Sequence, residues 1–465
     1  MHSFKFRNSV CLGTMDSRAY SWMLAVILVV VPSLGLCEEH LSRLEQAIEP
    51  SATSNRFMGA VLVAKDGKPL VDKGYGFANL EWQIPDSPTT KFRLGSLTKQ
   101  FTAASILLLE ERDKLKIDDP VKRYLPDAPA AWDKRTLVNL LTHTSGIPNF
   151  TDFPDYRASE ATPATPEQLI ARFRDKPLEF EPGDRWQYSN SGYVVLGYVI
   201  EKASGRHYAD FLRQNIFEPL GMQDTGYDSS ESIIPRRAQG YSPDEKGPRN
   251  AAYIDMSIPF SAGALYSTTH DLLRWEEGLF GGKLLSPASL KKMITPFKEN
   301  YAFGVFVRDE QGHKVIEHGG GIEGFNTHLA YFPDDKITVV VLANLNGNAV
   351  PEMGRNLGIV AIGGKIVLPN ERKAVDLPRA TLEKFVGRYE IAPTFNIRFF
   401  LEGDQLMAQA TGQSSLPVFA ESETDFFLKA VDARITFVKD AKGDVTGIVL
   451  HQGGHDQPGR RANGT

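Results

Sequence analysis

The chain has 465 residues, of which 42% are hydrophobic and 23% are charged, with a formal net charge of -5. This composition is that of a globular protein with a sizeable core, and the length indicates two or three domains. No run of lysine and arginine provides a basic surface, so nucleic acid is excluded as a partner.

Residues 1–37 are predicted to be an export signal. Arg7 and Arg18 precede the apolar run 22–31, and small residues with a proline follow it, which is the pattern of a secretory signal peptide. A membrane-spanning anchor is the less favoured alternative, because the run is short and is broken by Pro32. We therefore expect a protein of the bacterial periplasm or a secreted one. Lipid anchoring at Cys37, in a segment similar to a lipoprotein box, is the less favoured alternative.

The hydrophobic pattern of residues 38–368 predicts one domain of the α+β class. Gly59 to Asn79 reads as a β-hairpin that turns at Asp66-Gly67, and a buried helix runs from Ser96 to about Arg112. Further helices are predicted at 137–141, 166–173, 191–204, 208–220, 268–280 (capped by Ser267 or Thr269) and 352–362, and strands at 302–308, 314–318, 326–332 and 337–344. Strands at both ends with helices between them predict an antiparallel sheet flanked by helices, with an inserted helical lobe.

After Pro369 the pattern changes to short strands separated by tight turns. These strands are expected at 382–389, 395–401, 405–410, 416–420, 425–429, 434–439 and 445–451. They predict a small all-β barrel over residues 369–455, followed by a disordered tail, 456–465.

Ser96 and Lys99 are the first candidate catalytic pair. They lie one turn apart at the start of the buried helix, where burial and the helix N-terminus favour a neutral amine that can accept the proton of the hydroxyl. The spacing alone is weak evidence, because Ser289 and Lys292 repeat it at the start of what reads as a solvated surface helix.

Two further motifs carry candidate site residues. Tyr188 and Asn190 open a helix, where a phenol can relay a proton and an amide can orient the lysine and the substrate; alone, they could equally be a core tyrosine and a helix cap. His318, Gly319 and Gly320 end a strand, and the glycines leave N–H groups for an incoming carbonyl. A histidine in this position is by itself more often structural than catalytic.

Together the three motifs resemble the active-site motifs of the serine β-lactamase and penicillin-binding protein superfamily. The segments Leu140 to Gly146 and Glu181-Pro182-Gly183 are typical of its class C-like branch, which includes esterases, D-aminopeptidases and D-alanyl-D-alanine carboxypeptidases. The resemblance covers about residues 40 to 365, and the C-terminal unit is more loosely similar to the lipocalin-like domain of some of these hydrolases.

The resemblance implies hydrolysis of an ester or amide through a covalent serine ester, without a cofactor or metal. Ser96 would attack, and Lys99 and Tyr188 would share the general-base role, with the choice between them left open. The N–H groups of Ser96 and Gly321 would form the oxyanion hole. Asn190, with His318, Gly319 and Gly320, would bind the substrate, a small molecule or peptide; the oligomeric state is left open.

One departure from the superfamily shifts the expected substrate. Members that hydrolyse β-lactam drugs commonly have Lys-Thr-Gly where this chain has His318-Gly319-Gly320. A mostly neutral histidine should hold a substrate carboxylate less well than a lysine, which favours an esterase or D-amino-acid peptidase over a β-lactamase.

Other classes of protein fit the sequence less well. There is no Gly-x-Ser-x-Gly segment for a Ser-His-Asp hydrolase of the α/β type and no His-Glu-x-x-His segment for a metal hydrolase. A non-catalytic penicillin-binding or envelope-interaction protein remains as the alternative from outside the enzymes.

Overall fold

The computed structural model describes residues 40–244, 246–368, 371–431, 433–452 and 455–462. The predicted export signal and Cys37 lie outside these ranges. None of the helices in the described ranges is long and apolar enough to cross a membrane.

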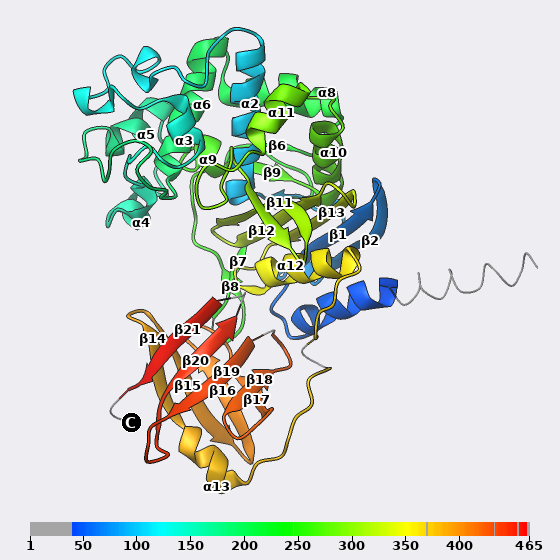
Figure 1. Cartoon of the computed structure of the whole chain (residues 1–465). Helices are drawn as coiled ribbons and strands as arrows, with labels where there is room; N and C mark the ends of the chain where they lie inside the picture. The colour runs from blue at the N-terminus through cyan, green and yellow to red at the C-terminus, as the bar shows by residue number, and fades with distance from the viewer. Residues whose placement is uncertain (1–39, 245, 369–370, 432, 453–454, 463–465) are drawn as a thin grey trace, which may run out of the picture. The chain divides into compact units, whose positions relative to one another are not determined.

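A six-stranded antiparallel sheet brings the two ends of the first domain together (Figure 1). Its strands, in spatial order, are β10 (Phe306–Glu310), β11 (His313–Ile322), β12 (Phe325–Phe332), β13 (Ile337–Ala343), β1 (Gly59–Lys65) and β2 (Lys68–Tyr75). The central pair is β1 with β13, in which Gly59 lies opposite Ala343 and Lys65 opposite Ile337. The predicted sheet and the hairpin turn at Asp66-Gly67 are confirmed, and the lobe between β2 and β10 is the insertion.

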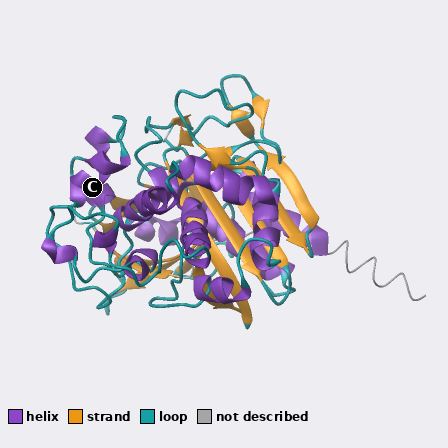
Figure 2. Ribbon diagram, turned by 90° about the horizontal axis from the view of Figure 1, so that it is seen from above, coloured by secondary structure: helices purple, strands orange, loops and turns teal. Residues whose placement is uncertain are grey.

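Both faces of the sheet centre are buried, and the side chains of β1 alternate between two cores. Ala60 and Leu62 belong to the core that contains α2 (Thr98–Glu111) and α10 (Thr269–Phe280). Val61 and Val63 belong to the core that contains α12 (Ala349–Ala361) and helical residues 44–53. Figure 2 shows the helices packed over the strands. The near-continuous hydrophobic strands follow from this two-sided burial.

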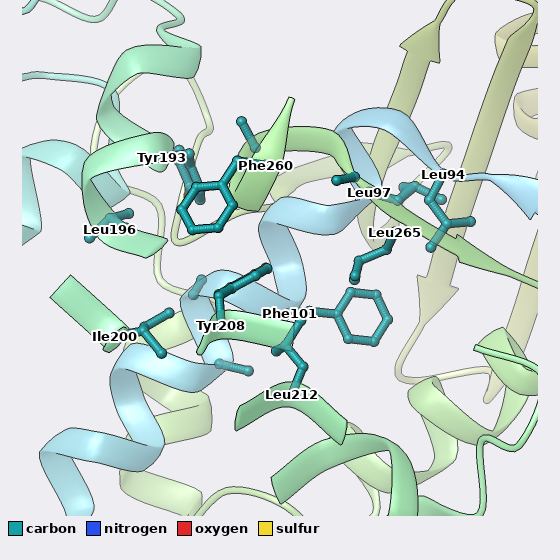
Figure 3. Close-up of a cluster of buried hydrophobic side chains, with 14 of the residues drawn as sticks. Leu94, Leu97, Phe101, Tyr193, Leu196, Ile200, Tyr208, Leu212, Phe260 and Leu265 are labelled. Atoms are coloured by element: carbon teal, nitrogen blue, oxygen red, sulfur yellow. The ribbon is translucent and has the colours of Figure 1, made fainter. Parts of the chain in front are cut away.

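Helix α2 is buried on all sides, and its segment anchors the larger core (Figure 3). In this close-up the labelled side chains of the α2 segment meet those of α6 and of the residues around α7 and α9; they are Leu94, Leu97, Phe101, Tyr193, Leu196, Ile200, Tyr208, Leu212, Phe260 and Leu265. Each of them is at most 8% exposed. From Thr98 to Leu109 every residue of α2 is buried, so packing on all sides holds the helix up to its last turn, as its shortage of polar surface predicted.

The inserted lobe is helical, as predicted. Its helices are α3 (Leu137–Leu141), α4 (Tyr156–Ser159), α5 (Pro166–Phe173), α6 (Asn190–Ser204), α7 (Tyr208–Leu212), α8 (Glu218–Leu220), α9 (Phe260–Gly263) and α11 (Pro287–Met293). Seven short strands form three small sheets of their own, β3-β4, β5-β9-β6 and β7-β8. They are β3 (Phe77–Asn79), β4 (Ile84–Pro85), β5 (Phe92–Arg93), β6 (Gly226–Tyr227), β7 (Tyr241–Ser242), β8 (Arg249–Asn250) and β9 (Leu265–Ser267). The cap of α10 is Thr268, which accepts from the N–H of Asp271, so the predicted caps Ser267 and Thr269 are each wrong by one residue.

The C-terminal unit is a closed barrel of eight antiparallel strands. They are β14 (Gly387–Ala392), β15 (Phe395–Glu402), β16 (Gln405–Ala410), β17 (Leu416–Ala420), β18 (Asp425–Leu428), β19 (Ala433–Lys439), β20 (Val445–Gln452) and β21 (His455–Arg461). Aromatic rings fill its interior, where Phe437 contacts Phe385, Tyr389, Phe399 and Phe426.

Two predictions for this unit are wrong. Residues expected to begin a strand at Leu382 form a short helix, α13 (Arg379–Leu382), and a following 3₁₀ turn, Glu383–Phe385. Residues expected to be a disordered tail from 456 instead include most of β21, which pairs with β20 and β14 and closes the barrel. Backbone pairing on both edges orders β21, although its sequence has no apolar alternation.

Candidate active site

Ser96 lies in a 3₁₀ turn, Gly95–Leu97, that leads directly into α2. The backbone of Gly95 has φ +54, a left-handed conformation that favours glycine, and this turn joins β5 to the helix. Lys99 follows one turn later and its side chain is fully buried. The predicted pair is therefore brought together.

The amine of Lys99 has three acceptors, and none of them is a carboxylate. Nζ lies 3.1 Å from Ser96 Oγ, 2.8 Å from Asn190 Oδ1 and 2.9 Å from the carbonyl oxygen of Ala262. Burial lowers the pKa of Lys99 well below 10.5. A neutral amine donates its two protons to Asn190 and Ala262, and its lone pair then faces the hydroxyl of Ser96. This geometry fits an amine that accepts the proton of Ser96.

Tyr188 lies just before α6, and its ring is beside the same amine. Nζ of Lys99 is 4.8 Å from the ring centroid. Burial raises the pKa of Tyr188, and contact with the Ser96 hydroxyl opposes this only in part. The phenol therefore keeps its proton at neutral pH, so Tyr188 is suited to deliver a proton rather than to remove one.

Asn190 is the first residue of α6 and is oriented by a polar network that sequence reasoning missed. Its N–H donates to Asn149 Oδ1 at 3.0 Å, and its Nδ2 donates to Thr151 Oγ1 at 3.1 Å. Asn149 also donates to Thr151, at 2.7 Å. With Oδ1 turned toward Lys99, one proton of Nδ2 remains for a substrate carbonyl. Thr151 lies in a short 3₁₀ turn, Phe150–Asp152, which Asn149 precedes. The sequence has no hydrophobic periodicity there, so it gave no signal for these two residues.

The glycines of β11 let this strand approach the nucleophile turn closely. A Cβ on Gly95 would lie 2.9 Å from the backbone nitrogen of Gly321, and a Cβ on Gly320 would lie 2.0 Å from the carbonyl oxygen of Leu94. Strand β10 begins at Phe306, which lies opposite Glu317. The part of β11 that contains the glycines extends beyond this pair and does not pair with β10. The arrangement places Ser96 and Gly321 side by side, as an oxyanion hole requires.

His318 occupies a different position from the one expected of a substrate-binding residue. It is 4% exposed, and its two ring nitrogens are both engaged. Nδ1–H donates to the carbonyl oxygen of Gly319 at 2.5 Å, and Nε2 accepts from the hydroxyl of Tyr301 at 3.3 Å. Burial lowers its pKa to about 3, so the ring is neutral. His318 was predicted to contact the substrate, but neither of its ring nitrogens is free to do so.

His143 is a second buried histidine that the residue-by-residue reading did not single out. Its ring centroid lies 4.4 Å from that of Tyr188 and 4.6 Å from that of Tyr301, and its Nδ1 accepts from the N–H of Ser189 at 3.2 Å. Burial lowers its pKa well below 6.5. The sequence indicated His143 only as a member of the segment Leu140 to Gly146, which is typical of the class C-like branch. His143 packs against Tyr188 as a neutral ring.

A cavity of about 620 Å³ opens over the nucleophile. Of the predicted site residues, Ser96, Asn190 and Gly321 line it, and the aromatic residues Phe150 and Tyr156 form part of its wall. Lys99, Tyr188, His318, Gly319 and Gly320 do not line it. The cavity is therefore lined by the predicted nucleophile, the predicted substrate-binding amide and one predicted oxyanion donor, whereas the buried Lys99 does not face it.

Charged residues that the sequence did not reveal lie on the cavity wall. Arg157, Glu160, Arg249 and Glu323 line it. Arg157 forms ion pairs with both Glu160 and Glu323; its side chain is 72% exposed, whereas those of Glu160 and Glu323 are 6% and 12% exposed. The two sheltered carboxylates thus share one surface arginine. In the described part of the chain, no group of three or more His, Cys, Asp or Glu could hold a metal ion.

Comparison with known proteins identifies the family of this chain. The family model described as Beta-lactamase matches residues 44–363, and a model described as a domain of unknown function matches residues 371–461. Penicillin-binding protein 4* of Bacillus subtilis (strain 168) is 30% identical over 445 residues, which cover 89% of this chain and 97% of that protein.

Solved structures give the same family. The octameric penicillin-binding protein homologue from Pyrococcus abyssi is similar with a TM-score of 0.66 and 26% identity, over 90% of this chain and 99% of that one. A D-stereospecific amidohydrolase from Streptomyces sp. is similar with a TM-score of 0.59 and 27% identity, over 70% of this chain and 99% of that one. The chain therefore belongs to the Beta-lactamase family and has the β-lactamase fold of its serine hydrolases.

Proposed function

We propose that the protein is an exported serine hydrolase that cleaves an ester or amide through an acyl-enzyme on Ser96. The observation that carries this proposal is the fully buried amine of Lys99, 3.1 Å from Ser96 Oγ, with only neutral acceptors around it. An amine held uncharged beside a hydroxyl is the requirement for making a nucleophile at neutral pH.

In this mechanism each proton has a carrier. Lys99 takes the proton of Ser96 as Oγ bonds to the substrate carbonyl carbon, and the N–H groups of Ser96 and Gly321 hold the oxyanion. When the bond to the leaving group breaks, Tyr188 gives that group a proton and regains one from the ammonium of Lys99. Water then attacks the carbonyl carbon of the ester while Lys99 takes a proton from it. The bond from this carbon to Ser96 Oγ breaks, Oγ regains its proton from Lys99, and the acid product leaves.

A neutral ester or amide is the favoured substrate. With a pKa of about 3, His318 supplies no cation for the carboxylate of a β-lactam. The similarity to a D-stereospecific amidohydrolase over 70% of the chain supports D-amino-acid amides and peptides as a further class. We expect the purified protein to cleave a p-nitrophenyl short-chain ester much faster than nitrocefin, and the reverse order would favour a β-lactamase.

Intact-mass spectrometry tests the nucleophile directly. The protein is incubated with a p-nitrophenyl ester, a D-amino-acid amide, a penicillin and a fluorescent phosphonate, and the mass of each adduct is measured. Ser96→Ala should form none of the adducts, whereas Ser289→Ala, in the other Ser-x-x-Lys segment, should form them all. Labelling of Ser96→Ala would disprove the assignment. A stable penicillin adduct without turnover of any substrate would support the penicillin-binding alternative.

Export by residues 1–37 is part of the same proposal and rests on their sequence pattern. Expression of the full chain in a bacterial host, followed by fractionation and N-terminal sequencing, tests it. Cleavage near residue 37 and recovery outside the cytoplasm are expected, and an uncleaved cytoplasmic chain would contradict it.

A further inference from the structure

The turn that follows Gly321 is closed by the side chain of Asn346. Strand β11 ends at Ile322, and β12 begins at Phe325. Oδ1 of Asn346 accepts from the N–H of Gly324 at 2.7 Å. Nδ2 donates to the carbonyl oxygens of Ile322 and Phe325, at 3.0 and 3.1 Å. One amide side chain thus binds both ends of the turn and its tip.

Hydrogen bonds of Asn346 and of the nearby Asn344 fix the segment that contains Asn346. The N–H of Asn346 donates to the carbonyl oxygen of Tyr241 at 3.0 Å. Two residues earlier, the fully buried Asn344 donates from Nδ2 to the carbonyl oxygens of Phe77 and Gln239, at 3.0 and 2.9 Å. The segment after β13 is therefore a fixed point from which the side chain of Asn346 reaches across to the turn.

A second asparagine extends the network to the pair of strands that contains Gly321. Asn326 lies opposite Gly321 in the register of β11 and β12. Its Oδ1 accepts from Asn346 Nδ2 at 3.2 Å and from the N–H of Gly347 at 2.9 Å. Both the turn beyond Gly321 and the residue opposite Gly321 are therefore bound to the segment 346–347.

We propose that Asn346 is a positioning residue that holds the N–H of Gly321 in the oxyanion hole, an inference that rests on the serine hydrolase function proposed above. A backbone donor has no side chain of its own to fix its direction, so the strand and turn around it must do so. Gly321 is one residue before the turn that Asn346 closes, and a donor must lie within 2.7–3.1 Å of the developing oxyanion to stabilise it. A shift of about 1 Å is enough to lose much of the rate.

Three substitutions of Asn346 separate this role from others. Asn346→Asp keeps the acceptor for Gly324 but turns an oxygen toward the three acceptors that Nδ2 now binds. Asn346→Ser retains at most one of the bonds, and Asn346→Ala removes them all without adding charge. The matched control is Asn348→Asp, which adds the same charge two residues away, at the exposed start of α12, where the side chain makes no cap hydrogen bond.

The readouts are kcat and KM for a p-nitrophenyl ester, and the inhibition constant of an alkyl boronic acid, whose adduct with serine places an oxygen in the oxyanion hole. The fraction of active enzyme is first counted with the phosphonate. Per active site, Asn346→Asp and Asn346→Ala should lower kcat by about 10²-fold, the effect of losing one oxyanion donor. KM should change little, the boronic acid should bind more weakly by a similar factor, and Asn346→Ser should be intermediate.

Each other outcome overturns the inference. If kcat per active site stays within about twofold of the parent, or if kcat falls while the boronic acid binds as before, Asn346 does not position the oxyanion donor. A loss confined to the active fraction shows a role in stability alone. If Asn346→Asp does not fold, the comparison of Asn346→Ser with the parent decides. An inactive parent that no phosphonate labels would refute the hydrolase function instead.

Discussion

At Lys99, burial and the count of acceptors together decide the protonation state. Ammonium would have three protons for three neutral oxygens, but no carboxylate to offset the cost of a buried charge. The neutral amine satisfies the same three contacts if Ser96 donates. Tyr188 has the opposite tendency, since burial raises its pKa. The two residues that the sequence left in competition for the base role are therefore separated by their surroundings.

The pH dependence of the ester reaction follows from the direction of the shift at Lys99. Because its pKa is far below 10.5, kcat/KM should rise as the amine loses its proton and reach a plateau well below pH 10. Lys99→Ala should lower kcat/KM by about 10²- to 10⁴-fold, whereas Lys292→Ala, in the exposed Ser-x-x-Lys segment, should leave it unchanged. Profiles of kcat/KM against pH for the parent and both variants check this. If Lys99→Ala keeps the same rise of kcat/KM with pH, Lys99 is not the group whose deprotonation activates the enzyme.

Glu276 predicts a pH dependence of stability that is unrelated to catalysis. It lies in α10, is 3% exposed, and its Oε2 has no hydrogen-bond partner among the described residues. Burial raises its pKa to about 8. The folded protein keeps this proton up to about pH 8 while the unfolded chain loses it near 4.5, so the stabilisation is complete below pH 4.5 and is lost as the pH rises through 8.

Glu276→Gln removes that titration and keeps the shape of the side chain. Relative to this variant, the unfolding free energy of the parent should fall by up to about 1.4 kcal/mol per pH unit between pH 5 and 8. Urea unfolding of both proteins across this range measures the difference. Asp86, whose pKa burial also raises to about 8, titrates in both proteins and cancels. Parallel stability curves would show that Glu276 ionises in the folded protein.

At the scale of elements, the distance between β11 and the nucleophile turn depends on which glycine is replaced. A Cβ on Gly320 would lie 2.0 Å from the backbone oxygen of Leu94, whereas a Cβ on Gly319 would meet only the carbonyl oxygen of Thr327, at 3.5 Å. Gly320→Ala must therefore push the strand away from the turn, and Gly319→Ala need not.

We expect Gly320→Ala to lower kcat for the ester by 10²-fold or more, since the strand bears the oxyanion donor Gly321, and to lower the melting temperature. Gly319→Ala is the matched control and should remain within a few-fold of the parent. Steady-state kinetics and thermal unfolding of the two variants provide the comparison. Equal activities would show that the close approach of β11 does not position the donor.

The hydrophobic pattern of the sequence could predict the helices and strands that are ordered by burying apolar side chains. The two-sided burial of β1 and β13, the apolar run of α2 up to Leu109 and the Asp66-Gly67 turn can each be recognised in the sequence. Strand β21 cannot, because it contains Pro458 and Gly459 and is ordered by pairing with two neighbours. Its existence follows only from the closure of the barrel.

The site divides in the same way. Ser96, Lys99, Tyr188 and Asn190 lie in short motifs, each weak by itself, and they were predicted because the motifs together resemble those of a known family. Arg157 and Glu160 lie in and just after α4, Glu323 lies in the turn between β11 and β12, and Asn346 follows β13. The fold brings these three distant segments together, and spacing along the chain does not predict that they meet. The position of His318 was missed because a motif shows residue type but not whether the ring faces the cavity or the core.

The shared arginine of the cavity wall predicts how the enzyme responds to charge on its substrate. Arg157→Ala would leave Glu160 and Glu323 without their common cation, although Arg249 also lines the cavity. The ratio of kcat/KM for a cationic ester to that for a neutral ester of the same size should therefore rise several-fold. Glu323→Gln should lower it. An unchanged ratio in both variants would place the acyl group away from this wall.

At the scale of the whole molecule, the residues that line the cavity all lie between Gly95 and Asn346. The sheet that supports them closes through β1 and β13, and its two cores lie within the first domain. The barrel has its own core of aromatic and aliphatic side chains. Each part therefore has the buried surface that a cooperative unit needs.

Because the barrel and the first domain have separate cores, a substitution that destabilises the barrel should leave the ester hydrolysis rate unchanged. Phe437 is 2% exposed and contacts four other rings of the barrel interior, so Phe437→Ala should destabilise this unit by about 3–5 kcal/mol. Calorimetry of the full chain should show one unfolding transition moved to lower temperature and another unmoved. At 25 °C, kcat and KM for a short-chain ester should match those of the parent, because no cavity residue has lost a contact. A parallel loss of activity, with the active sites counted by phosphonate, would instead show that the barrel supports the catalytic domain.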